Sequence, residues 1–177
     1  MTPFLETERL NLYKVTEEFC NDNYLSWLHD KEVNKYLDSG NLPISLDDLI
    51  LYVKNIPNDD IFLAIVIKEN KKHIGNIRIH SINYKNGLGE SGILLGDKSE
   101  WGKGYAKEAS IAVFNHCFNR LNLRKITMGA VQENIASIKL YEKIGFKQEG
   151  LFKKHAFYDG EFRNSIKMAL FKDDYIK

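Results

Sequence analysis

The sequence has few cysteines and prolines and almost no net charge. Among its 177 residues are two cysteines and three prolines, and the formal net charge is +1. A chain so close to neutrality has no global attraction for nucleic acid or for anionic membranes, so we predict neither as a partner. Cys20 and Cys117 stand far apart without CxxC or CxxH spacing. We expect two reduced thiols, with a disulfide as the alternative.

Long apolar runs and metal motifs are also missing. No segment approaches the roughly 20 apolar residues that a membrane-spanning helix needs, and the early acidic residues are unlike a signal peptide. The five histidines show no ligand spacing such as HExxH. We therefore expect a cytoplasmic protein that binds no metal and does not enter a membrane.

What the chain does contain is regular hydrophobic periodicity, with no repeat or linker to divide it. Helical and strand periodicities predict an α/β fold built as one domain. The first part predicts one strand and three helices, over 9–14, 16–29, 30–37 and 45–56, with residues 39–41 ending the second helix. The rest predicts strands over 61–67, 73–83, 90–95, 126–131, 146–155 and 162–171, and helices over 105–121 and 135–144. A turn at Asp159 and Gly160 would join the last two strands.

A glycine pair just ahead of a long predicted helix is the most informative local feature. Gly102 and Gly104 lack a Cβ, so the backbone can turn its amides toward one point, and the first helical turn adds partial positive charge there. Such a nest suits a pyrophosphate, with Lys103 and Lys107 at its rim. The alternative is a purely structural turn. A P-loop is excluded because GxxxxGK[ST] is absent, and GxGxxG fails because position 107 holds lysine.

A second motif favours a ligand-binding role for the glycine pair. Residues 101–106 read Trp-Gly-Lys-Gly-Tyr-Ala, and residues 134–146 read Asn-x-x-Ser-x-x-x-Tyr-Glu-Lys-x-Gly-Phe. Together they resemble the GCN5-related N-acetyltransferase (GNAT) superfamily, most nearly its ribosomal-protein-alanine acetyltransferase branch. The resemblance implies one GNAT-like domain with a mixed, mostly antiparallel sheet of six to seven strands flanked by helices. Its parts would be an acceptor-side strand and helices at 1–60, an acyl-CoA-binding core at 61–145 and a C-terminal strand pair at 146–177.

The resemblance also implies a cosubstrate, acetyl-CoA, and the residues that hold it. Its pyrophosphate would bind the loop formed by Trp101, Gly102, Lys103, Gly104, Tyr105 and Ala106. Backbone groups of Leu94 and Leu95 would pair with the pantetheine amides, and Asn134 and Ser137 would lie beside it. Trp101 departs from the Gln or Arg that the superfamily often has there, which removes a polar side-chain contact but spares the backbone amides.

Tyr141 matches the family's general acid, and Glu90 is the preferred base. Only a neutral amine attacks a thioester, so Glu90 would remove a proton through a water molecule and Tyr141 would protonate the departing thiolate. A backbone amide near Leu94 or Leu95 would stabilise the oxyanion. No covalent enzyme intermediate is needed, so neither cysteine has a catalytic role.

Each assignment has a structural alternative that the sequence leaves open. Asn134 stands where a helix N-cap is wanted, and Ser137 falls in the first turn of the same helix. Tyr141 shares a helical face with apolar residues and would suit the core. Glu90 would also suit the solvated end of a strand.

The acceptor is a small-molecule or peptide amine whose identity the sequence does not decide. By the family fold, the acceptor cleft would include Trp27, Asn34, Tyr36, His155 and Tyr158. Residues 24–36 look like segments of acetyltransferases in surface-polysaccharide synthesis, which favours a nucleotide-linked amino sugar. A protein N-terminus is the main alternative. A non-catalytic acyl-CoA sensor is disfavoured because the acid and base candidates are both present, and a monomer and a homodimer are equally compatible with the sequence.

Overall fold

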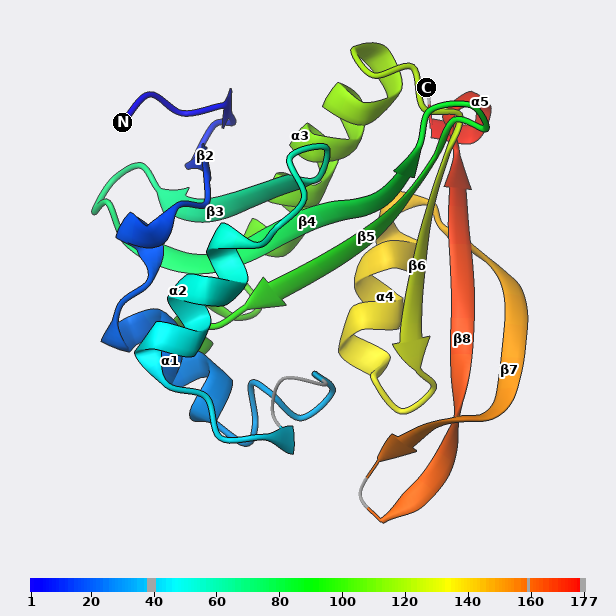
Figure 1. Cartoon of the computed structure of the whole chain (residues 1–177). Helices are drawn as coiled ribbons and strands as arrows, with labels where there is room; N and C mark the ends of the chain where they lie inside the picture. The colour runs from blue at the N-terminus through cyan, green and yellow to red at the C-terminus, as the bar shows by residue number, and fades with distance from the viewer. Residues whose placement is uncertain (38–40, 159, 176–177) are drawn as a thin grey trace. The chain divides into compact units, whose positions relative to one another are not determined.

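The computed structural model describes residues 1–37, 41–158 and 160–175. Eight strands form one sheet in the order β1-β2-β3-β4-β5-β6-β8-β7 (Figure 1). The strands are β1 Leu5–Glu6, β2 Leu10–Lys14, β3 Ile61–Ile67, β4 His73–Asn83, β5 Leu88–Leu95, β6 Lys125–Val131, β7 Lys147–Tyr158 and β8 Glu161–Phe171. The helices are η1 Glu17–Phe19, α1 Asp22–His29, α2 Leu46–Lys54, η3 Lys98–Glu100, α3 Tyr105–Asn119, α4 Ile135–Ile144 and α5 Lys172–Tyr175.

The mixed, mostly antiparallel sheet is confirmed. β5 and β6 run parallel, whereas β1–β2, β2–β3, β3–β4, β6–β8 and β7–β8 run antiparallel. The strand count exceeds the expected six to seven because β1 has only two residues. So short a strand carries no readable alternation.

The chain packs as two compact units. The first unit contains Met1–His80 and Gly92–Ala112, and the second contains Ser81–Ser91 and Val113–Lys177. The limits fall inside β4, β5 and α3, so each of these elements contributes residues to both units. Each unit is described below by itself.

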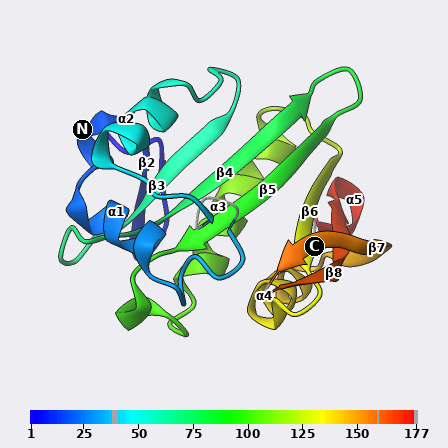
Figure 2. The same ribbon diagram turned by 60° about the horizontal axis from the view of Figure 1, so that its bottom comes forward.

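The first unit builds its core from α1, α2 and the strands beneath them. Tyr24 and Trp27 of α1 and Leu49 of α2 pack with Phe62 and Ala64 of β3. α1 and α2 lie beside each other in both views (Figures 1 and 2). This arrangement leaves one face of the β3–β4 hairpin under helices, which is where a cavity is found below.

Capping decides where α2 begins. Ser45 accepts a hydrogen bond from the amide of Asp48, whose carboxylate accepts one from the Ser45 amide. This capping box satisfies two amides that the first turn leaves without partners. The predicted helix after Ser45 is therefore confirmed.

The two helices predicted over 16–29 and 30–37 need correction. The first splits into η1 and α1, because Asn21 caps a new start by accepting from the Tyr24 amide. The second is a series of turns, in which the Asp30 carboxylate accepts from the amides of Glu32 and Val33. Side chains that bond nearby amides compete with helix formation. The predicted end of the second helix, at 39–41, lies partly outside the described residues.

Elsewhere the predicted boundaries agree closely with the structure. The elements at 61–67, 73–83 and 135–144 are confirmed to the residue. β5 begins at Leu88, two residues early, because Leu88 and Gly89 pair with Lys125 and Ile126 of β6. Asp159, placed in the predicted final turn, is outside the described residues.

The second unit centres on three aromatic rings. Tyr141 of α4 lies between Phe114 of α3 and Phe146, with ring centroids 6.4 Å and 4.9 Å away. α4 runs alongside β6 in Figure 1. Gly145 ends α4 with φ +114°, a left-handed conformation that glycine adopts without strain.

One of the expectations drawn from scarcity can be compared directly with the structure. Cys20 and Cys117 are both free thiols, as predicted. Among the residues that the structure describes, no helix combines the length and apolar character required to cross a membrane.

Candidate active site

The predicted phosphate loop has the backbone conformation that its glycines suggested. Gly102 and Gly104 have φ of +76° and +86°, and α3 starts at the next residue, Tyr105. The amide of Glu108 is the first to bond back into the helix, to the Gly104 carbonyl at 3.0 Å. Within 1–37, 41–158 and 160–175, no recorded hydrogen bond starts from the backbone amides of 102–107. The loop therefore offers a group of backbone donors at the positive end of a helix.

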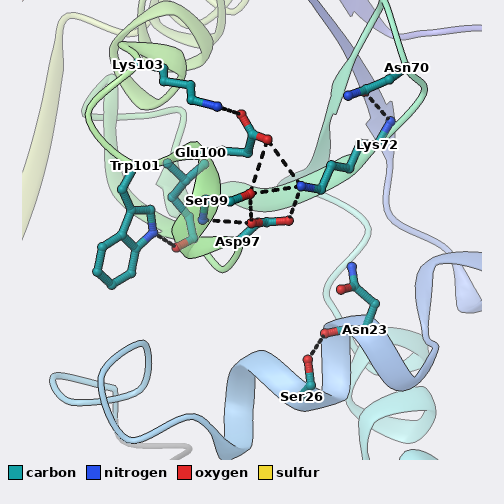
Figure 3. A network of polar contacts seen from close by, with 10 residues as sticks. Asn23, Ser26, Asn70, Lys72, Asp97, Ser99, Glu100, Trp101 and Lys103 are labelled. Atoms are coloured by element: carbon teal, nitrogen blue, oxygen red, sulfur yellow. Dashed lines mark hydrogen bonds and ion pairs between the residues drawn. The ribbon is translucent and has the colours of Figure 1, made fainter.

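A polar network anchors the turn that precedes the loop (Figure 3). The buried Glu100 carboxylate accepts from Lys103 at 2.8 Å and from Lys72 at 3.2 Å, and Lys72 also pairs with Asp97 at 2.7 Å. Ser99 donates to Asp97 at 2.6 Å. The Lys103 hydrogen bond, followed by that of Lys72, holds the pKa of Glu100 below its usual value against the effect of burial. Lys103 is thus engaged with protein rather than directed only to solvent.

Trp101 has a structural partner. Its indole Nε1 donates to the Leu95 carbonyl at 2.7 Å, as Figure 3 shows. The contact ties the loop to the end of β5, from which the pantetheine contacts were predicted. Leu94 is the other residue predicted for that role, and its carbonyl oxygen lies 2.2 Å from where a Cβ on Gly75 would stand. Only glycine fits at that point of β4.

Arg9 lies beside the loop and was missed by the sequence reasoning. Its guanidinium donates to the Lys103 carbonyl at 3.1 Å and to Glu108 at 2.7 Å, and stands 4.4 Å from the Tyr105 ring centroid. It adds a cation next to the backbone donors. A distant charge of this kind leaves no local spacing signal in the sequence.

The second unit brings Tyr141 together with a serine that no sequence motif had indicated. The Tyr141 hydroxyl and Ser91 Oγ lie 2.9 Å apart, and both residues are buried. Burial raises the pKa of Tyr141 to about 12, with the nearby Glu90 charge acting in the same direction and Ser91 against it. The phenol is therefore neutral at pH 7 and holds a proton that it can give.

Glu90 and Asn134 also have partners in the second unit. The Glu90 carboxylate accepts from Lys167 Nζ at 2.6 Å, and each side chain is about one-third exposed. Asn134 Oδ1 accepts from the Ser137 amide at 3.2 Å, so the helix cap considered above is present. Asn134 keeps its amide nitrogen and the second lone pair of Oδ1 for a further contact.

A cavity of about 620 Å³ opens in the first unit. It is lined by residues of α1, α2, β3, β4 and β5, among them Tyr24, Tyr52, Asn76, Arg78, His80 and Leu94. The Arg78 guanidinium is held by Asp60 at 2.7 Å and by the Tyr52 hydroxyl at 3.0 Å. The cavity has the size of a small-molecule site, with apolar walls and a few polar groups.

Three of the predicted acceptor residues are in the first unit, but outside the described lining of this cavity. Trp27 is buried, and a Cβ on Gly96 would stand 2.0 Å from its ring. Asn34 donates to the Leu28 carbonyl at 2.6 Å, and Tyr36 lies under Lys35 Nζ at 5.4 Å. None of these three belongs to the described lining of the cavity. His155 and Tyr158 are on β7, in the second unit.

Residues 9–147 match the family model described as "Acetyltransferase (GNAT) domain". The chain belongs to the GNAT acetyltransferase family. Two relatives support the assignment. An uncharacterized N-acetyltransferase, p20, of Bacillus licheniformis is 32% identical and covers 97% of each chain. The spermidine N(1)-acetyltransferase of Escherichia coli K12 is 30% identical and covers 75% of this chain and 69% of its own.

A solved structure agrees with the fold of this acetyltransferase. The spermidine N-acetyltransferase of Vibrio cholerae, in complex with CoA and spermine, aligns with a TM-score of 0.82. The alignment covers 97% of this chain and all of that one, at 24% identity. The family is thus confirmed, whereas the ribosomal-protein-alanine branch is not, since the neighbours include spermidine acetyltransferases.

His73 of the acetyltransferase is a titratable group inside the first-unit core. Phe19 and Trp27 pack on its ring at centroid distances of 5.0 Å and 4.9 Å. Burial lowers the pKa of His73, although its hydrogen bonds with Asn76 and the Gly75 carbonyl oppose the shift. The imidazole is therefore neutral at pH 7.

Acid should destabilise the protein through His73. The unfolded chain takes up a proton near the ordinary pKa of 6.5, before the folded chain does, so the free energy of unfolding falls as pH drops below about 6.5. We expect His73→Gln to show a smaller loss between pH 7 and pH 5 in urea denaturation. His155→Gln, at an exposed histidine, is the control. An equal loss in wild type and His73→Gln would contradict the prediction.

Proposed function

We propose that this acetyl-CoA-dependent N-acetyltransferase moves the acetyl group directly to a primary amine in a ternary complex. The observation that carries the proposal is the conformation of Gly102 and Gly104 ahead of α3, which leaves the amides of 102–107 available. A diphosphate accepts hydrogen bonds from such amides and is stabilised by the helix dipole. Arg9 adds a cation beside them.

The loop residues 101–106 would bind the pyrophosphate of acetyl-CoA, with Trp101 and Lys103 acting mainly to shape the loop. The pantetheine would run along the backbone of Leu94 and Leu95. The Leu95 carbonyl already accepts from Trp101, which leaves one of its two lone pairs for this pairing. Asn134 and Ser137 would border the same arm of the cofactor.

Tyr141 would act as general acid and Glu90 as general base. A neutral phenol can protonate a departing thiolate, whose pKa by analogy with cysteine is about 8.5. The Tyr141 hydroxyl is positioned by Ser91. Glu90 is ion-paired with Lys167, so it would accept the proton of the amine through a water molecule while Lys167 holds its orientation.

The cavity of the first unit is the proposed acceptor site. It is lined by Gly92, Ile93 and Leu94 of β5, the strand that also carries Glu90. The proposed base and the proposed acceptor site thus share one strand.

For the acceptor itself we propose a nucleotide-linked amino sugar, with a protein N-terminus, as in ribosomal-protein-alanine acetyltransferases, as the alternative. Spermidine, the substrate named for two of the relatives, is a third candidate acceptor to be included in assays. The two free thiols are typical of a reducing compartment, which supports a cytoplasmic location.

Substitution of Gly102 tests the carrier site. A Cβ added there meets no atom within 4 Å, so in the free protein Gly102→Ala costs only the strain of a positive φ, about 1–2 kcal/mol. In the complex the methyl group would stand at the amides that bind phosphate. We expect the Kd for acetyl-CoA to rise about 10-fold or more, the equivalent of one strong hydrogen bond.

Gly160→Ala is the matched control, since Gly160 has φ +80° and open space at its Cβ in the turn between β7 and β8. Both variants should lose similar stability, but only Gly102→Ala should lose affinity in calorimetry. If the wild type shows neither heat nor a change in melting temperature with acetyl-CoA, the proposed function fails.

A further inference from the structure

We propose that the first-unit cavity selects amines that carry an oxygen hydrogen-bond acceptor close to the nitrogen, and that Asn76 recognises this oxygen. The inference deepens the proposed function, because it rests on the cavity being the acceptor site. The oxygen is a hydroxyl or a carbonyl, as found in amino sugars and at peptide N-termini. An oxygen-free polyamine belongs to a different chemical class.

The orientation of the Asn76 amide is fixed by its neighbour. His73 Nε2 lies 3.0 Å from the Gly75 carbonyl and 2.9 Å from Asn76 Oδ1. A carbonyl only accepts, so Nε2 must carry the hydrogen. The Asn76 atom that shares this hydrogen is then necessarily its oxygen. His73 thereby turns Asn76 Nδ2, with its two hydrogens, away from itself.

This nitrogen is a buried donor with at least one hydrogen left over. Asn76 is 3% exposed, and among the described residues no acceptor meets Nδ2 with full hydrogen-bond geometry. Asn76 still lowers the pKa of the nearby Tyr24 hydroxyl by hydrogen bonding, against the larger rise caused by burial, and Tyr24 can use at most one of the two Nδ2 hydrogens. A buried donor left unsatisfied is costly, and native proteins seldom keep one without a function.

The donor stands on the face of β4 that lines the cavity. Asn76, Arg78 and His80 are two residues apart along the strand, so they share one face, and all three line the cavity. Arg78 adds a guanidinium to this row. The cavity wall on β4 is therefore rich in donors, which suits oxygen atoms on the ligand.

The carboxylates near this wall are already engaged. Asp60 holds Arg78, and Asp48 accepts from the amide and hydroxyl of Ser45 at 2.9 Å and 2.6 Å. Asp60 offsets the charge of Arg78 and Asp48 keeps its own, so charge alone does not exclude a polyammonium ligand. Such a ligand would leave Asn76 Nδ2 without an acceptor, whereas a hydroxyl or carbonyl would accept from it.

The test is a set of matched acceptors with acetyl-CoA as donor. In the first pair, glucosamine and a nucleotide-linked amino sugar are compared with cyclohexylamine. In the second pair, a short peptide is compared with an alkylamine of similar length. Spermidine is assayed alongside both pairs. Rates are compared at equal concentrations of neutral amine. We expect kcat/KM to favour the oxygen-bearing member by about 10- to 100-fold, the range for one buried hydrogen bond. The sugar and peptide arms tell the two sources apart.

Asn76→Leu removes the donor and should bring the ratio within each pair close to one. Asn11→Leu is the control, because Asn11 is also a buried asparagine, on β2, with an unpaired Oδ1 and no place in the described cavity lining. Should Asn76→Leu not fold, Asn76→Ser replaces it and should lower the ratio as well. A preference that is unchanged in the Asn76 variant would overturn the inference.

A readout without turnover separates this inference from the proposed function. The side-chain NH₂ signals of Asn76, identified by their absence from the Asn76→Leu spectrum, should shift with oxygen-bearing amines and not with oxygen-free ones. A preference for spermidine, or Asn76 NH₂ signals that do not shift with any amine, would overturn the inference while leaving acetyl-CoA chemistry intact. No binding of acetyl-CoA would instead remove the proposed function.

Discussion

Tyr141→Phe is expected to lower kcat by about 10²-fold while leaving the affinity for acetyl-CoA close to that of the wild type. The variant loses one hydroxyl, which lies 2.9 Å from Ser91 Oγ and is buried with it. General acid–base groups contribute roughly 10²–10⁴ in rate. Phenylalanine keeps the ring contacts with Phe114 and Phe146, so the fold should be preserved. Steady-state kinetics with calorimetry of acetyl-CoA binding measures both quantities.

The pH profile adds a second check on Tyr141. Because its pKa is about 12, the phenol keeps its proton throughout pH 6 to 9. Titration of Tyr141 should therefore cause no fall in kcat over this range, and the wild type and Tyr141→Phe should show pH profiles of the same shape. Ser91→Ala removes the partner but retains the phenol, and its loss of kcat should be smaller. Unchanged turnover in Tyr141→Phe would remove this residue from the mechanism.

Glu90→Gln is expected to lower kcat/KM at pH 7 by about 10²-fold, within the usual range for a general base. The defect should shrink as pH rises toward the pKa of the acceptor, which for an α-amine is about 7.7–8.0, because a larger fraction of the amine is then already neutral. Glutamine preserves size and polarity. A pH series of kcat/KM on wild type and variant measures the effect.

Lys167→Met distinguishes a base from a structural ion pair. Lys167 donates to Glu90 at 2.6 Å, so both variants break the same pair, but only Glu90→Gln removes the carboxylate. If Glu90 is the base, Lys167→Met should retain most of the activity. Equal losses at every pH would mean that Glu90 acts only by holding the structure.

The parts of the site that depend on local chemistry could be read from the sequence. The left-handed glycines of the loop and the helix capped by Asn134 and ended by Gly145 are encoded within a few residues. The branch of the family was not confirmed, because local motifs are shared by several branches. The acceptor residues stay a prediction. Contacts such as that of Trp27 with Gly96 are tertiary and have no local signal.

The same reasoning explains which functional candidates were missed. Ser91 looks like an ordinary strand residue until Tyr141, fifty residues later, is seen to share its hydrogen bond. Asn76 and Arg78 lie in a strand whose boundaries were predicted to the residue. Strand alternation defines their common face, but not the helices that enclose a cavity above it. The sequence therefore predicted the helices and strands better than it predicted which polar side chains come together in the folded protein.

The charged cluster around Glu100 bears on the association rate and on the entropic cost of binding in the proposed cosubstrate site. Lys72 and Lys103 clamp this buried carboxylate, and Trp101 is fastened to β5. In the proposed carrier site, a turn held by these contacts would lose little chain entropy when the ligand binds. We therefore expect binding with almost no backbone rearrangement, so that weakening the Glu100 contacts would slow association before it affected the chemistry.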